Sequence, residues 1–192
     1  MESSAASQPT ILMRAEIPGR SVVTNIVLAL AGSLLLALSA KIQVPFWPVP
    51  MTMQTMVVLL IGMAYGTRIG GATMLLYLAE GAMGIPVFAG PGAGPTYFLG
   101  PTGGYLVGFA AAAGLAGWLA ERRPLGVRGV AVVMAVGHAL IFAFGLAWLS
   151  ALVGFEKAIA VGLTPFVAAT VVKIALGTAL LQAAWWGLTQ RR

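Results

Sequence analysis

The sequence predicts an all-α integral membrane protein with six transmembrane helices and both termini in the cytoplasm. Hydrophobic residues make up 59% of the 192 positions, whereas charged residues make up only 8%. A soluble domain carries about 25% charged residues, so most of this surface is expected to face lipid. At about 20 apolar residues per span, the chain has room for roughly six spans and for no second domain.

Six apolar runs follow a polar amino-terminal stretch. Residues 1–20 lack the order of regions found in a signal peptide, so we expect a short cytoplasmic tail before a single six-helix domain over residues 21–190. The expected spans are residues 22–40, 52–66, 69–83, 105–120, 129–153 and 165–188. The second and third runs meet at Gly66, Thr67 and Arg68, and both runs are short, so this pair is predicted to form a tight helical hairpin.

Two of the connections are rich in proline or glycine. Prolines at positions 45, 48 and 50 prevent helix in residues 41–50 and favour an extended loop. Residues 84–104 are too interrupted by Gly and Pro for a long helix, and they carry no charge. Irregular backbone at membrane depth survives only where it is buried in protein or lines a cavity. Residues 41–50 and 84–100 are therefore expected to close a pocket on the outer side, between the third, fourth and sixth helices.

The basic residues predict the orientation of the bundle. With the amino end inside, only Lys41 and Lys157 fall on the outer side, whereas the inner side holds Arg14, Arg20, Arg68, Arg122, Arg123, Arg128, Arg191 and Arg192. Cytoplasmic loops carry the excess of Lys and Arg, so both termini are expected to be cytoplasmic. The net charge of +6 is scattered between the spans, and we expect membrane lipid rather than nucleic acid as the partner.

The composition leaves little material for catalysis or metal binding. The chain has no Cys, a single His, and five acidic residues that are all Glu. Disulfides, thiolate metal sites and cysteine nucleophiles are excluded, and a serine–histidine or paired-acid constellation is missing. We expect neither an enzyme nor a bound cofactor.

Lys173 is the most unusual residue, because it lies about nine residues into the last predicted span. A Lys at the centre of the bilayer costs about 2.5–3.5 kcal/mol, so it normally faces the bundle interior and has a partner. One interpretation is that Lys173 contacts a ligand, and the other is that it forms a buried ion pair with Glu80. Glu80 itself is expected to contact ligand, to orient Lys173, or to reach headgroup water.

Other polar residues near the outer ends of the spans are candidate ligand contacts. Gln54 opens the second span together with Thr52 and Thr55, and these side chains either bind a polar ligand or cap the helix. His138, in the fifth span, either contacts ligand or joins two helices by a hydrogen bond. The fourth span opens with Gly103, Gly104 and Tyr105, where exposed backbone N–H groups favour an anion or a carbonyl oxygen, although a simple turn has the same signature.

The first span carries small residues at four-residue spacing, namely Ala29, Ser33 and Ala37. This spacing lets another helix approach closely. The stripe serves either internal packing or the docking of a partner protein.

Four stretches of the chain together resemble the BioY family, the biotin-specific S-components of energy-coupling-factor (ECF) transporters. They are KIQVPFWPVPMTMQT (41–55), YLAEGAMGIPVFAG (77–90), GPTGGYLVGF (100–109) and FGLAWL (144–149), and LTPFVAATVVK (163–173) is a weaker match. The resemblance implies a six-helix S-component bundle whose outer pocket binds biotin. It also implies that the stripe on the first helix docks an ECF coupling protein, which works with ATP-binding subunits in a bacterial inner membrane.

The resemblance carries over to some site residues and fails at others. Lys173 matches a family lysine, but the Pro-Gly-Asp stretch that usually precedes it is here Ala168, Ala169 and Thr170. The family aspartate contact is therefore lost, or Thr170 or Glu80 replaces it, and His138 stands where the family often has Asn. Biotin uptake with or without the ECF module is the function that the resemblance implies. The alternative is an ion- or proton-coupled carrier for another small carboxylate or vitamin.

Overall fold

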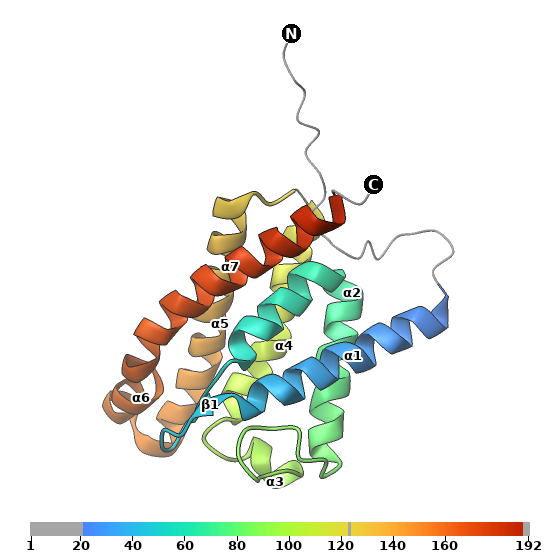
Figure 1. Ribbon diagram of the computed structural model, residues 1–192. Coiled ribbons are helices and arrows are strands. Elements are labelled where there is room, and N and C mark those ends of the chain that lie inside the picture. The colour runs from blue at the N-terminus through green and yellow to red at the C-terminus, as the bar shows by residue number, and fades with distance from the viewer. Residues whose placement is uncertain (1–20, 123, 190–192) are drawn as a thin grey trace.

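The computed structural model describes residues 21–122 and 124–189, which form a bundle of helices and one short hairpin (Figure 1). The predicted tail at residues 1–20 lies outside the described residues. The elements in chain order are α1 (Val22–Lys41), β1 (Gln43–Val44), β2 (Met51–Thr52), α2 (Gln54–Ala82), α3 (Pro95–Phe98), α4 (Gly103–Arg122), α5 (Val127–Val153), α6 (Phe155–Gly162), the 3-10 helix η1 (Thr164–Phe166) and α7 (Val167–Thr189).

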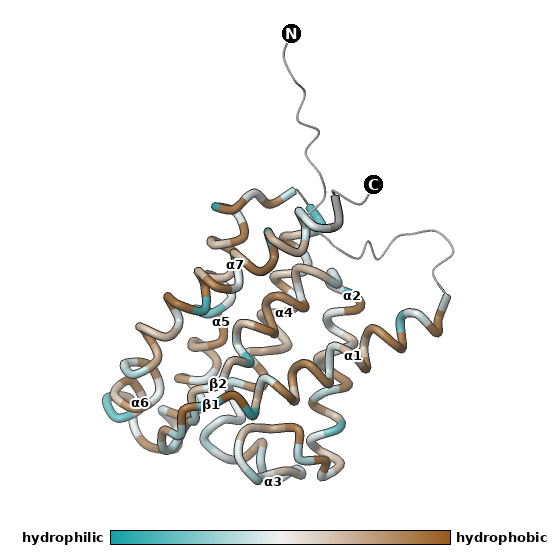
Figure 2. The backbone as a smooth tube through the Cα atoms, viewed as in Figure 1, coloured by the Kyte–Doolittle hydropathy of each residue, from teal (hydrophilic) through white to brown (hydrophobic). Residues whose placement is uncertain are grey.

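Long apolar helices dominate the fold, as the hydropathy colouring in Figure 2 shows. Within the described residues, five helical stretches are long and apolar enough to cross a membrane: Val22–Lys41, Gln54–Ala82, Gly103–Arg122, Val127–Val153 and Phe155–Gly187. The helical, multi-pass class predicted from the sequence is confirmed. The number of six crossings depends on α2 and stays a prediction.

α2 reverses direction within its length, because Gly66 has non-helical backbone angles of φ 79° and ψ 178°. The two arms of α2 run up and back down in Figure 1. They pack closely, since a Cβ added at Gly70 would lie 3.3 Å from the Cα of Gly62. The turn is held by Glu121 of α4, which accepts hydrogen bonds from the backbone N–H of Thr67 (2.6 Å) and from its hydroxyl (2.8 Å). This is the hairpin that the short second and third runs predicted.

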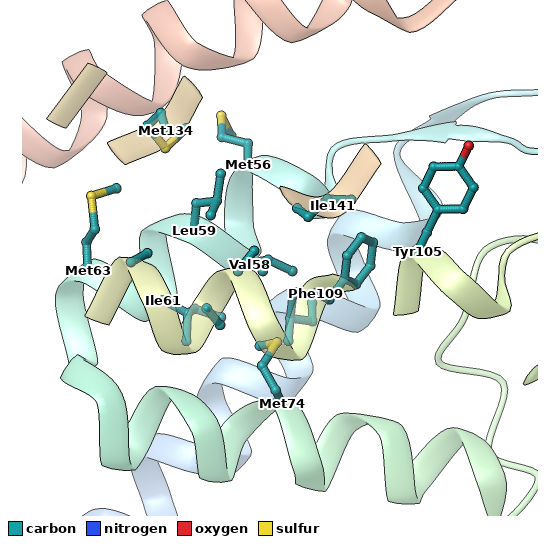
Figure 3. Close-up of a cluster of buried hydrophobic side chains, with 14 of the residues drawn as sticks. Met56, Val58, Leu59, Ile61, Met63, Met74, Tyr105, Phe109, Met134 and Ile141 are labelled. Atoms are coloured by element: carbon teal, nitrogen blue, oxygen red, sulfur yellow. The ribbon is translucent and has the colours of Figure 1, made fainter. Parts of the chain in front are cut away.

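α2, α4 and α5 form the centre of the bundle. Small residues permit close contact there, because a Cβ at Gly62 would lie 2.5 Å from the carbonyl oxygen of Ala113, and one at Gly137 would meet Leu59 at 2.2 Å. Aliphatic and methionine side chains fill the space between these helices (Figure 3). Tyr105 lies at the edge of this cluster and its hydroxyl points away from the methionines. The centre of the bundle is therefore closely packed.

α1 lies obliquely across the outside of α2 (Figure 1). Its inward face includes Gly32, Ser33 and Leu36, all of which are buried. Ser33 donates a hydrogen bond to the Glu80 carboxylate on the second arm of α2. Ala29 and Ala37 are half-buried on the same side. The predicted stripe of small residues thus lies at the packing face of α1 within this chain, and the outward face is aliphatic.

The Gly/Pro-rich segment between α2 and α4 is ordered by aromatic packing rather than by regular structure. Phe88 is fully buried, contacts Tyr77 edge-to-face at 5.4 Å between ring centroids, and stacks on Tyr97 at 4.7 Å. Gly81 makes room for it, since a Cβ there would lie 2.0 Å from the Phe88 ring. Because this irregular backbone is packed against helices, it survives at the end of a membrane bundle as expected.

Candidate ligand-binding site

A cavity lies where the hairpin loop and the Gly/Pro-rich segment meet the beginnings of α2, α4 and α7. Its lining combines hydrophobic walls with a few polar groups from five parts of the chain: Val49, Pro50, Thr52, Gln54, Thr55, Phe88, Ala89, Tyr97, Thr102, Tyr105, Leu106, Phe109, Phe142, Phe166 and Lys173. Residues 41–50 and 84–100 both contribute, as the sequence predicted for the pocket. The third predicted run does not line the cavity, and the start of α2 and Phe142 of α5 take its place.

Aromatic rings make one wall of the cavity. Phe142 lies 6.4 Å from Tyr105 and 6.2 Å from Phe166, in edge-to-face arrangements. Phe166 is held at the start of the last span by η1, and Tyr105 donates a 2.9 Å hydrogen bond to the Gly162 carbonyl at the end of α6. This wall offers an apolar surface to a ring or an alkyl chain.

Lys173 supplies the cation of the cavity. Its side chain is 5% exposed, and its Nζ donates a 3.2 Å hydrogen bond to Oγ1 of Thr55. A lysine ammonium has three N–H donors, so one bond to Thr55 leaves capacity for a ligand acceptor. A buried cation beside apolar walls favours an anionic or strongly accepting group in the ligand.

Gln54 presents an amide at the beginning of α2. Its Nε2 donates to the Tyr77 hydroxyl at 2.5 Å, and its Oε1 accepts from Thr52 at 3.2 Å. The Tyr77 hydroxyl in turn donates to the Val87 carbonyl at 3.0 Å. This chain of bonds joins the start of α2 to the Gly/Pro-rich segment and orients the amide at the cavity.

A second hollow adjoins the first and shares four lining residues with it, namely Pro50, Ala89, Tyr97 and Thr102. Tyr97 donates to the Ala89 carbonyl at 3.1 Å. Burial raises the pKa of the Tyr97 hydroxyl, which therefore stays neutral at physiological pH. The shared residues therefore lie between the two hollows.

Several predicted site residues lie elsewhere. Thr170 is half-buried on α7 but is not part of the lining. Gly103 and Gly104 serve close packing, because a Cβ at Gly103 would lie 1.9 Å from the Phe98 carbonyl oxygen and one at Gly104 would lie 2.3 Å from Trp148. These two glycines begin α4, as predicted, and they bring its first turn against neighbouring backbone.

Glu80 and Lys173 have different partners in the described part of the chain. Glu80 accepts from Ser33, Lys173 donates to Thr55, and Glu80 does not line the cavity. The buried ion pair that the sequence left open is therefore absent from the contacts of these two side chains. Glu80 joins α1 to α2 in this structure.

His138 is 2% exposed and lies behind the cavity wall rather than in it. Its Nδ1 contacts the Met134 carbonyl at 2.8 Å, and its Nε2 contacts Oγ1 of Thr55 at 3.2 Å. It therefore joins α5 to α2, as the helix–helix interpretation anticipated. It reaches the cavity through Thr55.

Sequence reasoning did not select most of the apolar lining. Phe109 lies one helical turn after Tyr105, and this spacing was a usable signal. Phe142 and Phe166 carry no local signal, because each stands among many apolar residues and only the packing of α5 and η1 brings it to the cavity. Tyr97 and Thr102 belong to a segment that was expected to close the pocket as a whole.

The comparisons with known proteins agree with one another. A model of the BioY family matches residues 8–190. The chain belongs to the BioY family. A probable biotin transporter BioY from Pyrococcus horikoshii is 40% identical over 141 residues, covering 73% of this chain and 83% of that protein. The biotin transporter BioY of Thermotoga maritima is 38% identical over 141 residues, with the same two coverages. BioY2 of Lactococcus lactis is 32% identical over 165 residues, covering 83% and 91%.

A solved structure shares the fold of this BioY-family chain. It is a crystal structure of the S-component for biotin from an ECF-type ABC transporter, with a TM-score of 0.71 and 21% sequence identity. The alignment covers 84% of this chain and 90% of that chain. At this identity the likeness establishes the fold of the BioY-family chain, which is the S-component bundle that the resemblance implied.

Proposed function

We propose that this protein is a biotin-binding membrane subunit for biotin uptake. The BioY family membership supports this function, and so do relatives named as biotin transporters at 30–40% identity. The observation that carries the proposal is the buried ammonium of Lys173 in an otherwise largely apolar cavity. Biotin combines an apolar thiophane ring and alkyl tail with a ureido group and one carboxylate, and this combination suits such a cavity.

The assignment of polar groups follows from their chemistry. Lys173 offers a charged donor to the carboxylate or to the ureido oxygen. Gln54 has both a donor and an acceptor, which suits the ureido group, and the rings of Phe142 and Phe166 suit the thiophane. Of the residues predicted from the sequence, we retain Lys173, Gln54 and Tyr105 as direct contacts. Glu80, Gly103, Gly104 and Thr170 are proposed to act by supporting the structure around the cavity.

We further propose that the protein works in a bacterial inner membrane with six crossings, both termini in the cytoplasm, and the cavity facing outward. A subunit without an ATP-binding motif needs ATP-binding subunits and a coupling membrane protein if its uptake is ATP-driven. The helix that would meet such a protein is α1, whose outward face is aliphatic and lies at the edge of the bundle. The small-residue stripe Ala29, Ser33 and Ala37 would contribute if α1 shifted on α2.

The test is biotin binding to the purified protein, with dethiobiotin and lipoate as competitors. Lys173→Met should weaken biotin binding by about 10- to 150-fold, because a hydrogen bond to a charged group is worth about 1.5–3 kcal/mol. Met keeps the length of the side chain and removes the charge. The melting temperature without ligand should stay equal or rise, since an expensive buried charge is gone.

Two controls sharpen this experiment. Lys157→Met removes an exposed charge from α6 and should leave affinity unchanged. Adding Glu80→Gln to Lys173→Met should change the melting temperature by the same amount as Glu80→Gln alone, because the two residues have different partners. Unchanged affinity in Lys173→Met would remove Lys173 from the site, and a wild-type protein that does not bind biotin would overturn the proposed function.

A further inference from the structure

Thr55 connects the cavity lysine to a histidine that does not reach the cavity. Its Oγ1 lies 3.2 Å from Nζ of Lys173 and 3.2 Å from Nε2 of His138. His138 is 2% exposed and is anchored through Nδ1 to the Met134 carbonyl at 2.8 Å. Three helices, α5, α2 and α7, are thereby joined by one row of hydrogen bonds that ends at the ammonium group.

The direction of each bond in this row follows from its ends. The Met134 carbonyl can only accept, so Nδ1 of His138 carries a proton. A neutral imidazole protonated at Nδ1 has Nε2 as an acceptor, and the Thr55 hydroxyl hydrogen then points to Nε2. The lone pairs of the Thr55 oxygen are left facing Lys173, which can only donate. Every bond is satisfied when the imidazole is neutral, and a proton on Nε2 would add a second cation close to the ammonium.

We propose that His138 and Thr55 are positioning residues that hold the ammonium of Lys173 at the cavity for the ligand. This inference rests on the proposed function and adds to it the group that orients the cation. Lysine has a flexible four-carbon side chain, and holding it in one rotamer before binding reduces the entropy lost when the ligand arrives. His138 acts only through Thr55, because it does not line the cavity.

The binding experiment compares variants that remove or restore one hydrogen bond of this row. Thr55→Val keeps the shape and removes the hydroxyl, and it should weaken biotin binding about tenfold. Thr55→Ser returns the hydroxyl and should restore most of that loss. His138→Asn keeps an amide near Met134 but is too short to reach Thr55, whereas His138→Gln can accept from Thr55. We expect His138→Gln to bind biotin several-fold more tightly than His138→Asn.

A double-mutant cycle separates positioning from direct contact with biotin. If Thr55 acts through Lys173, adding Thr55→Val to Lys173→Met should cost less than about twofold in further affinity. An independent contact between Thr55 and biotin would give the full tenfold loss again, and that result would overturn the proposal. Equal affinities for His138→Asn and His138→Gln would also overturn it. Melting temperatures of all variants are measured alongside, so that a folding defect is recognised.

A spectroscopic experiment tests the same row of bonds without biotin. The chain contains a single histidine, so nitrogen-15 NMR of histidine-labelled, tag-free protein reports on His138 alone. We expect a neutral ring with the proton on Nδ1 and an Nε2 signal that shifts in Thr55→Val toward that of a nitrogen without a hydrogen bond. Lys173→Met should shift it less. A proton on Nε2 would overturn the inference even if biotin binds. An Nε2 chemical shift that is the same in Thr55→Val as in the wild type would overturn it too. Absence of biotin binding with these NMR results would overturn the proposed function alone.

Discussion

Lys41, at the last turn of α1, fastens the Gly/Pro-rich segment to the bundle. Its Nζ donates to the Phe88 carbonyl at 2.8 Å and to the Gly90 carbonyl at 3.2 Å. Phe88 and Ala89 line the cavity, so this lysine acts on the wall from outside. From the sequence, Lys41 counted only as one of two basic residues on the outer side. Nothing local signals that its partners lie 47 and 49 residues away.

We predict that Lys41→Met accelerates biotin dissociation by about fivefold with little effect on association. The bonds to two loop carbonyls are partly exposed, and about 1 kcal/mol is a reasonable value for their loss. Stopped-flow or filter-binding dissociation rates measure the effect. Lys157→Met is the matched control on α6 and should leave the rate unchanged. Equal dissociation rates for wild type and Lys41→Met would show that the segment is held without this lysine.

Prediction at the residue scale succeeded where burying a charged side chain in the membrane costs free energy. It failed for residues that resemble their apolar neighbours in the sequence. Lys173 was identified because a charge deep in a span needs a partner, and the structure places it at the cavity. Glu80 was equally conspicuous, yet its partner Ser33 lies on α1, and the sequence does not reveal how α1 rotates against α2. The same unknown rotation left Ser33 open between internal packing and the docking of a partner, and its bond to Glu80 shows that it packs within this chain here. Apolar lining residues such as Phe142 carry no signal because the whole chain is apolar.

At the scale of elements, α2 shows how a single glycine divides a helix. The arms before and after Gly66 pack on each other, and Glu121 binds the first N–H of the second arm at Thr67. The sequence revealed this turn because two short apolar runs met at residues 66–68. It did not reveal that a carboxylate from α4 completes the turn, since that contact spans 54 residues.

Gly66→Ala should destabilise the protein by about 1–3 kcal/mol. Its φ of 79° with an extended ψ is accessible almost only to glycine, and a Cβ there would lie 2.5 Å from Oε1 of Glu121. Thermal unfolding in detergent without ligand measures the loss. Gly71→Ala is the control on the same arm, because it is helical with open space around its Cβ, and it should melt at the same or a slightly higher temperature. Equal losses from both substitutions would contradict this account of the turn.

At the scale of the whole molecule, hydrogen bonds show that the loops between helices gather at two opposite ends of the bundle. The bonds from Thr67 to Glu121 join the α2 turn to the end of α4. At the other end, Trp148 donates to the Gly100 carbonyl at 2.9 Å, and Tyr105 joins the start of α4 to the end of α6. The cavity lies at this second end. The sequence anticipated this division because successive apolar spans alternate in direction, so their connections alternate between the two ends of the bundle.

The number of membrane crossings depends on whether each of the two arms of α2 spans the bilayer. At 1.5 Å per residue, 54–65 rises about 18 Å and 67–82 about 24 Å, and each is shorter than a hydrocarbon core of about 30 Å. Two short arms can cross a bilayer that is thinned or protected by neighbouring helices, or they can enter and leave on one side. Burial inside the bundle permits both arrangements.

We predict that the α2 turn reaches the cytoplasmic side, together with the connection between α4 and α5. The chain has no cysteine, so single substitutions can be labelled with a membrane-impermeant maleimide on intact cells without background. Trp47→Cys, at an 81% exposed position, and Lys157→Cys should react from outside. Arg68→Cys and Arg128→Cys should react only after the membrane is permeabilised, because basic residues remain on the inner side.

Reaction of Arg68→Cys from outside, with Arg128→Cys still protected, would make α2 a re-entrant hairpin and reduce the crossings to four. Since the Thr67–Glu121 bonds tie that turn to the end of α4, such a result would also require those bonds to be absent in the membrane.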